Sequence, residues 1–201
     1  MKTLIAAVAL AMAAGGAAQA SLITSESDPA LTGASITDFN SQTIGNFTSA
    51  SVGDLTFSVI GGGQLRFAQF NEGGDFGGDG INLSTRDLTD DFRIDFASPV
   101  SAFATIWGAA NTTWDVSVYD SGDNLIETQT FPSGPPYDEF FGVAAANISY
   151  AIFDQNGSRD WVLLDDIRVV SGETSPVPLP AGGLLLLSGL GAAVLLRRSK
   201  G

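Results

Sequence analysis

The runs Phe92-Arg93-Ile94-Asp95-Phe96 and Trp114-Asp115-Val116-Ser117-Val118-Tyr119 decide the fold class of this chain. In both runs apolar and polar residues alternate one by one, which is the pattern of a β-strand with one buried face. Residues 55–59, Leu-Thr-Phe-Ser-Val, repeat the pattern. Residues 21–176 contain no ten-residue stretch with the three-and-four apolar spacing of an amphipathic helix. The sequence therefore predicts an all-β domain.

Less regular apolar stretches predict further strands over residues 100–107, 125–131, 148–153 and 161–170. Turn-forming residues separate the stretches, and the segment from Asp120 to Asn124 predicts a hairpin around Gly122. Eight to ten short strands at this interval indicate a two-sheet sandwich, and we expect it to be of the jelly-roll type. Aromatic residues should fill its core. For Trp107, Trp114 and Trp161 we favour core packing over the alternative role of a platform for a sugar ring.

The composition excludes several kinds of chemistry. The chain has no cysteine and no histidine, and residues 21–176 contain no lysine. These absences exclude disulfides, histidine-dependent nucleophiles, histidine-ligated metals and lysine Schiff bases in that region. All 22 acidic residues lie there, against five arginines. Nucleic acid is therefore excluded as a partner, because its phosphates would be repelled. The acidity suits divalent cations and neutral sugars, although the general acidity of a secreted protein is the simpler interpretation.

The amino-terminal residues have the pattern of a secretory signal peptide. Lys2 gives a positive start, residues 4–14 are apolar, and Ala18-Gln19-Ala20 forms a small-x-small cleavage site before Ser21. We therefore predict a signal peptide over residues 1–20. A retained anchor is the alternative.

The carboxyl-terminal residues have the pattern of a membrane segment. The motif Val177-Pro178-Leu179-Pro180-Ala181 precedes the apolar residues 182–196, and Arg197 and Arg198 follow. From Ala181 this helix would be about 24 Å long, and arginine snorkelling can close the gap to about 30 Å of hydrocarbon. The basic residues should stay in the cytoplasm, so that everything before residue 177 lies outside.

The order of proline motif, apolar helix and basic residues resembles the PEP-CTERM family of bacterial sorting signals, in its VPLPA variant. The resemblance covers about the last 26 residues. It implies transient insertion in the inner membrane and recognition by an exosortase-type transpeptidase. That enzyme would cut near the motif and pass the protein to the cell surface or to an exopolysaccharide matrix. A plain single-span anchor is the alternative.

The globular part is also similar, more loosely, to the globular part of many PEP-CTERM proteins and to lectin-like and carbohydrate-binding jelly rolls. The similarity lies in residues 92–100 (FRIDFASPV), 116–122 (VSVYDSG), 140–143 (FFGV) and 164–167 (LDDI). The resemblance implies a structural calcium ion, which is common in such domains. It implies no catalytic residues. We expect a signal peptide at 1–20, a β-sandwich at 21–172, a linker with the motif at 173–181, a transmembrane sorting helix at 182–196 and a basic tail at 197–201.

Asp165 is the first candidate metal ligand. It shares strand parity with Leu163 and Ile167, so we expect its side chain to point toward the buried side. A buried carboxylate is costly unless a cation or hydrogen-bond donors compensate it. Calcium, which takes six to eight oxygen ligands, is one solution. The other is a position at the sheet margin, with donors from backbone amides or from Arg168. The candidate calcium ligands of this group are Asp38, Asn40, Asp165 and Asp166.

The glycine-rich residues 71–80 are the second candidate metal site. Their acidic members, Glu72, Asp75 and Asp79, resemble the ligands of calcium-binding glycine-rich repeats, although only one irregular copy is present. A surface loop without a metal is the favoured alternative. Tyr137, beside two prolines, is the aromatic residue that we expect to be exposed and available to a ligand.

These observations favour a non-catalytic protein for adhesion, matrix structure or carbohydrate binding. The alternative is a surface carbohydrate-active hydrolase, because paired carboxylates can cleave glycosides without histidine. Acidic residues are plentiful, but the sequence singles out no pair.

Overall fold

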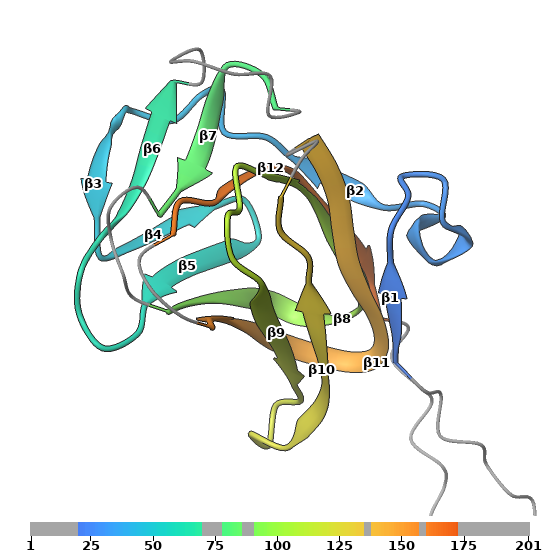
Figure 1. Ribbon diagram of the computed structural model, residues 1–201. Coiled ribbons are helices and arrows are strands. Elements are labelled where there is room, and N and C mark those ends of the chain that lie inside the picture. Colours follow the sequence, from blue (N-terminus) through green and yellow to red (C-terminus); the bar gives the residue numbers. More distant parts are fainter. Residues whose placement is uncertain (1–19, 70–77, 86–90, 135–137, 157–159, 173–201) are drawn as a thin grey trace, which may run out of the picture.

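The computed structural model describes residues 20–69, 78–85, 91–134, 138–156 and 160–172, which form an antiparallel, all-β sandwich (Figure 1). This described part contains twelve strands and one short 3-10 turn, η1 (Pro29–Leu31). The strands are β1 (Ser21–Ile23), β2 (Ser35–Thr37), β3 (Gly45–Phe47), β4 (Ser49–Val52), β5 (Leu55–Val59), β6 (Leu65–Gln69), β7 (Ile81–Ser84), β8 (Phe92–Gly108), β9 (Trp114–Tyr119), β10 (Leu125–Phe131), β11 (Asp138–Gln155) and β12 (Leu163–Ser171). The predicted all-β sandwich class is confirmed.

Two long strands, β8 and β11, build the sandwich. They pair with each other in antiparallel fashion along most of their length. Each contains an exposed corner, at residues 97–99 in β8 and at residues 146–147 in β11. Asn147 has a positive φ of 62° at its corner. The first layer therefore contains β4, β5, β9 and β10 with one half of each long strand, and the second layer contains the other strands with the other halves.

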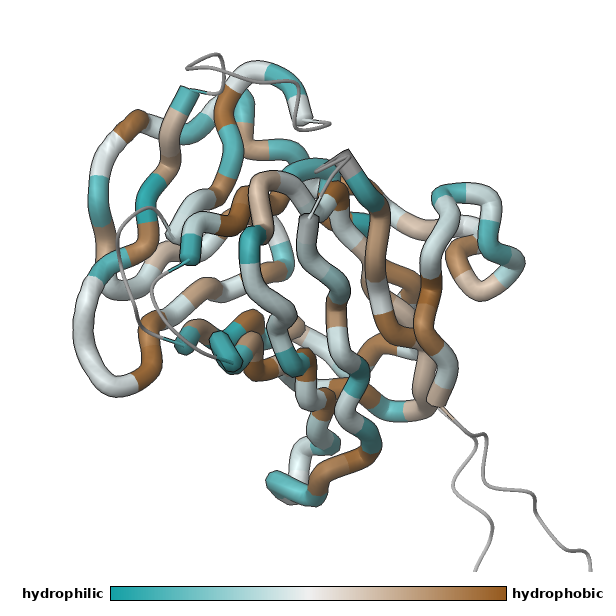
Figure 2. Tube along the Cα trace, viewed as in Figure 1, coloured by the Kyte–Doolittle hydropathy of each residue, from teal (hydrophilic) through white to brown (hydrophobic). Residues whose placement is uncertain are grey.

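Hydrophobic and hydrophilic residues alternate along the regular strands, as the colours along the tube in Figure 2 show. In β8, Phe92, Ile94 and Phe96 are buried, whereas Arg93 and Asp95 lie on the outer face. The period of two in the sequence therefore identifies the buried face of this strand correctly.

Aromatic rings from both layers meet at the centre. Phe153 stacks on Phe92 within the first layer at a centroid distance of 4.5 Å, and on Trp107 of the second layer at 6.1 Å. Trp107 and Trp114 are buried and pack edge to face at 5.9 Å. Burial of such rings contributes about 25 cal/mol per Å², which stabilises a chain that has no disulfide. Core packing of Trp107 and Trp114 is thus confirmed.

The amino-terminal segment covers the outer face of the second layer. β1 pairs with β11, and the side chain of Ile23 is fully buried. Leu31 of η1 joins Ile23 in a small apolar cluster with Ala102 and Ala104 of β8. The first strand of the described residues therefore begins at Ser21 and is anchored in the sandwich by Ile23.

The predicted strand count is too low, and the reason is physical. Strands over residues 92–96 and 100–107 are one strand, because β8 bends at its corner and pairs with β11 on both sides of it, with register shifts between the two paired stretches. Six short strands, β1 to β4, β6 and β7, lack an alternation long enough to be recognised. The hairpin around Gly122 is confirmed, since β9 and β10 flank it and Asp120 Oδ1 accepts a hydrogen bond from the Gly122 N–H at 2.8 Å.

Within the described ranges, no helix has both the length and the apolar character needed to cross a membrane. The predicted signal peptide, except Ala20, and the predicted sorting helix at 182–196 lie outside those ranges. The following predicted site residues lie outside them as well: Ala18, Glu72, Asp75, Tyr137, Val177, Pro178, Leu179, Pro180, Ala181, Arg197 and Arg198.

Candidate functional site

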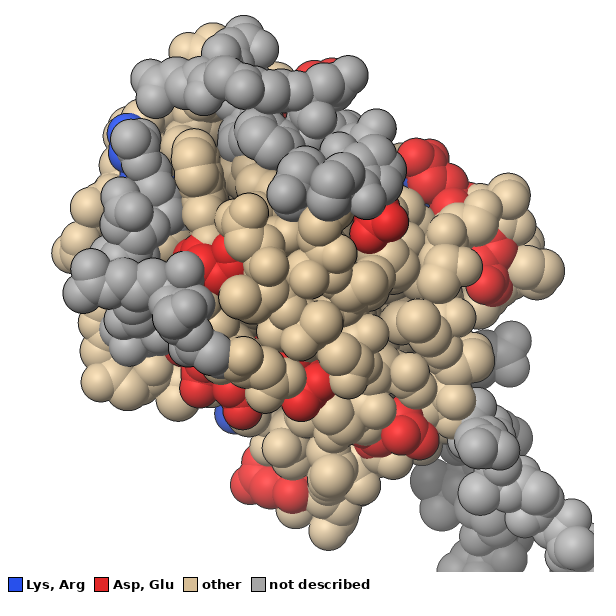
Figure 3. All heavy atoms as spheres, in the orientation of Figure 1, with Lys and Arg blue, Asp and Glu red and all other residues tan. Residues whose placement is uncertain are grey.

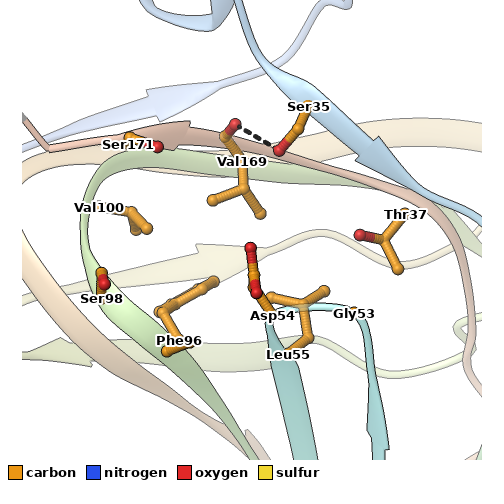
Figure 4. A pocket seen from close by; sticks show the side chains of 11 residues that line it. Ser35, Thr37, Gly53, Asp54, Leu55, Phe96, Ser98, Val100, Val169 and Ser171 are labelled. Carbon is orange, nitrogen blue, oxygen red and sulfur yellow. Dashed lines mark hydrogen bonds between the residues drawn. The ribbon is translucent and has the colours of Figure 1, made fainter.

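A cavity of about 320 Å³ opens at the corner where β8 passes from one layer to the other (Figure 4). Strands β2 and β12 of the second layer form one wall, and the β4–β5 turn with the β8 corner forms the other. The volume lies at the lower end of the range for small-molecule sites, about 300–1,000 Å³. The cavity can thus hold one small ligand or one unit of a polymer.

The lining combines neutral hydroxyl groups with an apolar surface. Its side-chain oxygens belong to Ser35, Thr37, Asp54, Ser98 and Ser171. Its apolar surface comes from Leu55, Phe96, Ala97, Val100 and Val169. Among these lining residues Asp54 is the only charged one. The Ser35 hydroxyl donates to the Val169 carbonyl oxygen at 3.3 Å, whereas Thr37, Asp54 and Ser98 make no side-chain hydrogen bond within the described chain.

Backbone contacts hold the walls of the cavity in place. Gly53 has a φ of 58°, a conformation that suits glycine, and it turns the chain so that Asp54 enters the cavity (Figure 4). The Ala97 N–H donates to the Asp54 carbonyl oxygen at 2.9 Å, and the Gly172 N–H donates to the Pro99 carbonyl oxygen at 3.0 Å. The cavity is therefore formed before any ligand arrives.

The structure brings Asp79, the one described member of the second predicted metal group, beside residues of the first group in one acidic cluster. Asp165 of β12 is only 2% exposed, and its Oδ2 accepts hydrogen bonds from the Asp79 N–H at 3.0 Å and from Asn82 Nδ2 at 3.1 Å. Asn40 Nδ2 donates to Asp79 Oδ1 at 3.2 Å. The Asn40 N–H in turn donates to Asp38 Oδ1 at 2.9 Å. Asn82 takes part in this cluster although the sequence analysis did not single it out.

Backbone amides donate hydrogen bonds to the Asp165 carboxylate. Such donors were one of the two predicted ways of compensating its burial, and calcium was the other. Besides the Asp79 N–H, the Asp166 N–H donates to Asp165 Oδ1 at 2.9 Å. Arg168 is not a partner of Asp165, because its guanidinium pairs with Glu26. It also lies over the ring of Phe140, with a distance of 5.3 Å from Cζ to the centroid.

The predicted burial of Asp165 is confirmed, but the parity that it was predicted to share with Ile167 needs a correction. Leu164 and Ile167 pack in the main core, whereas Leu163 packs with Ala109 and Trp161 in a separate cluster. The pairing of β12 with β8 shifts register after Asp165, and Asp166 has a positive φ of 46°. This bulge reverses the side-chain parity, so that Asp165 is buried on the face away from the main core.

We expect the ionisation of Asp165 to destabilise the fold in the absence of a divalent cation. Burial is the main cause that raises the pKa of this carboxyl to about 6; the amides of Asp166 and Asp79 lower it in part, and their carboxylates raise it again. The carboxyl group of an unfolded aspartate has a pKa of about 3.9. The native state therefore binds the proton more tightly than the unfolded state does. The resulting stability is complete below about pH 4 and is lost as the pH rises through about 6.

Asp165→Asn should remove this pH dependence: the free energy of unfolding of the variant relative to that of the parent should be about 2 kcal/mol higher at pH 7.5 than at pH 4.5 in chelator. Thermal or urea unfolding of the parent and the variant at both pH values measures the effect. Parallel pH profiles of the two proteins would contradict it. Burial, followed by the nearby Asp79 carboxylate, also raises the pKa of Asp166.

An aromatic pair on the outer face of the first layer was missed by the sequence analysis. Tyr119 and Tyr150 stack at a centroid distance of 4.8 Å, and the Arg93 guanidinium lies 3.5 Å from the centre of the Tyr150 ring. The Tyr150 hydroxyl donates to Asp123 Oδ1 at 3.0 Å. Both faces of the Tyr150 ring are thus occupied, and this pair is not a free platform for a sugar. Trp161, also considered as a platform, is half-buried and donates from Nε1 to Ser84 Oγ at 2.8 Å.

Comparison with known proteins gives no assignment to a family. No protein-family model and no curated protein matches the chain. A mutant of a family 29 carbohydrate-binding module is similar over 73% of this chain and 98% of its own, with 14% identity and a TM-score of 0.39. Two cleaved adhesin domains of Lys-gingipain from Porphyromonas gingivalis cover 70% and 69% of this chain and 99% and 98% of their own, with identities of 12% and 15% and TM-scores of 0.46 and 0.42. These values describe a distant likeness and carry no functional assignment to this chain.

Proposed function

We propose that this chain is an exported, non-catalytic β-sandwich that binds a neutral sugar unit of an extracellular polysaccharide in the cavity at the β8 corner. The chemistry of the cavity lining is the observation that carries this proposal. A sugar offers hydroxyl groups and an apolar ring face, and the cavity offers matching groups. Asp54 and the hydroxyls of Thr37 and Ser98 are available to bind sugar hydroxyls, while Phe96 and Val169 pack against ring carbons.

The electrostatics of the domain favour a neutral ligand over an anionic one. Among the described residues that line the cavity there is no lysine or arginine, and Asp54 carries the single charge. Acidic side chains are also spread over the face shown in Figure 3, with little positive charge among them. A phosphate or a uronic acid would meet repulsion and would lack the arginine partner that such groups prefer.

The cavity does not support the alternative of a glycoside hydrolase. Glycoside hydrolysis generally uses two carboxyl groups about 5–9.5 Å apart, on either side of the scissile bond. In the described part of the cavity Asp54 has no second carboxylate beside it. The residues that line it can therefore bind a sugar, but they provide no acid–base pair.

Closing the cavity is expected to abolish polysaccharide binding. Ser98 is exposed at the β8 corner, so a tryptophan there fills the opening without entering the core. Asp54→Ala removes a charged acceptor and should weaken binding roughly 10-fold or more. Binding of the full chain, purified in detergent, to arrayed neutral polysaccharides measures both effects.

Ser51→Trp is the matched control, because Ser51 is also exposed on the first layer but lies outside the cavity lining. It should leave binding unchanged. If Ser98→Trp binds as well as the parent while both variants melt normally, the cavity is not the sugar site.

Export and sorting are part of the same proposal, and the boundaries of the sandwich support it. The first strand begins at Ser21, directly after the predicted cleavage at Ala20, and the last strand ends at Ser171, ahead of the motif from Val177 to Ala181. Both predicted cleavages would leave every described strand intact. The intact mass of the protein recovered from native cells tests this part: retention of residues 182–201 in the mature product would contradict processing by an exosortase.

A further inference from the structure

A buried amide oxygen without a partner lies in the acidic cluster. Asn82 of β7 is only 1% exposed, and its Oδ1 accepts no hydrogen bond. Such an oxygen is rare in a folded chain, because burial removes its water without replacing it. The amide group of Asn82 faces Asp165, since its Nδ2 lies 3.1 Å from Asp165 Oδ2. The orphaned Oδ1 is the other terminal atom of the same amide, so it lies next to the hydrogen bond between Asn82 and Asp165.

Two glycines allow the chain to close over these oxygens. A Cβ atom on Gly78 would lie 2.2 Å from Asn82 Nδ2 and 2.9 Å from Asp165 Oδ2. A Cβ atom on Gly80, which has a φ of 56°, would lie 1.8 Å from Asn40 Oδ1. Residues 78–80 consequently form a tight cover over polar side chains that come from β7, β12 and the loop before β3.

We propose that Asp79, Asn82 and Asp165 bind a calcium ion that joins β12 to the start of β7. On calcium binding, a half-turn of the Asn82 amide replaces the hydrogen bond from Nδ2 and places Oδ1 about 3 Å from Asp165 Oδ2, with the cation between the two oxygens. Adjacent ligands of calcium, with bonds of about 2.3–2.6 Å, lie about that far apart. Asn40 holds the Asp79 carboxylate through its hydrogen bond of 3.2 Å, and water completes the coordination shell.

The ligand set determines the expected affinity. No three acidic side chains in the described ranges are grouped closely enough to hold a metal by themselves, so the amide oxygen of Asn82 is a necessary third ligand. Two carboxylates and one amide predict a dissociation constant of about 10⁻⁴ to 10⁻³ M, which is typical of extracellular calcium modules. Magnesium, which demands a near-ideal octahedron, should bind more weakly.

The first test is a calcium titration of the full chain, purified in detergent and stripped with chelator. We expect saturable one-to-one binding by calorimetry, and a rise in melting temperature of about 5 °C in 10 mM calcium chloride. Asp165→Asn should lose both responses. Asp154→Asn is the matched control: Asp154 also has a raised pKa, caused by burial and then by Asp91 and Asp115, but it lies on the outer face of the first layer. It should keep both responses.

The second test separates a cation site from a network of hydrogen bonds. Asn82→Asp places a second carboxylate against Asp165, so it should melt lower than the parent in chelator. If calcium binds between them, the variant binds it at least tenfold more tightly and recovers the parent's melting temperature in 10 mM calcium. A variant that stays destabilised in calcium would overturn the proposal, as would a parent protein that shows neither heat nor a thermal shift.

Discussion

Replacing Asp160 by alanine is expected to lower the free energy of unfolding by about 4 kcal/mol at pH 7. Asp160 is 4% exposed and lies just before β12, where it organises the loop between β8 and β9. The Asn111 and Thr112 N–H groups donate to its Oδ2 at 3.1 and 3.0 Å, and Trp114 Nε1 donates to the same atom at 3.0 Å. The Trp161 N–H donates to Oδ1 at 2.7 Å.

The size of the effect follows from the donors that would be left without a partner. Alanine removes both carboxylate oxygens, and water cannot easily replace them beside the buried Trp114 ring. Each buried donor without an acceptor costs about 1–3 kcal/mol. Urea unfolding of the parent and the variant, monitored by tryptophan fluorescence, measures the loss.

The loss is also expected to depend on pH. Burial alone would raise the pKa of the Asp160 carboxyl, but the hydrogen bonds from Trp114, Asn111, Thr112 and Trp161 outweigh it and the pKa lies below its usual range. A lowered folded pKa gives stability that is complete above the unfolded value of about 3.9 and is lost as the pH falls through the folded value. The difference between parent and variant should therefore shrink below pH 4.

Asp120→Ala is the matched control for burial. The Asp120 carboxylate accepts a similar set of hydrogen bonds, from Gly122 and Asn124, but in the exposed turn between β9 and β10. Water can replace those bonds, so the variant should lose much less stability. Equal losses in the two variants would contradict the role that we assign to burial at Asp160.

The sequence predicted which side chains of the regular strands are buried, because a period of two needs only local residues. The alternation in residues 92–96 and 114–119 is correct at every position: Phe92, Ile94, Phe96, Trp114, Val116 and Val118 are buried. The same alternation could not show that β8 continues beyond Phe96, since a bend changes the direction of a strand without leaving a strong mark in its sequence.

The orientation of Asp165 shows where local parity fails. The bulge at Asp166 depends on how β12 pairs with β8, which is a property of two distant segments. The candidate metal groups were likewise predicted as two separate sites, whereas Asp79 and Asp165, which are 86 residues apart, are joined by a hydrogen bond. Asn82 and Asp160 were missed because an isolated polar residue gives no sign of burial. The only sequence signal for Asp160 is its position before Trp161 in a turn region, and this signal does not identify the donors that its carboxylate accepts from.

Gly142→Ala is expected to destabilise the fold by about 3 kcal/mol through overpacking. Gly142 lies in β11 between two neighbouring strands, opposite Ile23 of β1 and Ala104 of β8. A Cβ atom there would lie 2.2 Å from the Phe103 carbonyl oxygen and 2.5 Å from Ala104 Cα. These are backbone atoms of the central strand, so they cannot move aside as a flexible side chain would. The melting temperature and urea unfolding of the variant measure the cost.

Gly45→Ala is the control for the loss of glycine itself. Gly45 also lies in a strand, β3, but a Cβ atom there would meet nothing within 4 Å. Alanine restricts the unfolded chain without a clash in the folded one, so this variant should be stabilised by about 0.5 kcal/mol. The two substitutions are chemically identical and are predicted to act in opposite directions. If Gly142→Ala has the same melting temperature as Gly45→Ala, strands β8 and β11 can move apart by about an ångström without loss of stability. Close contact between the two long strands is then not required for the stability of the sandwich.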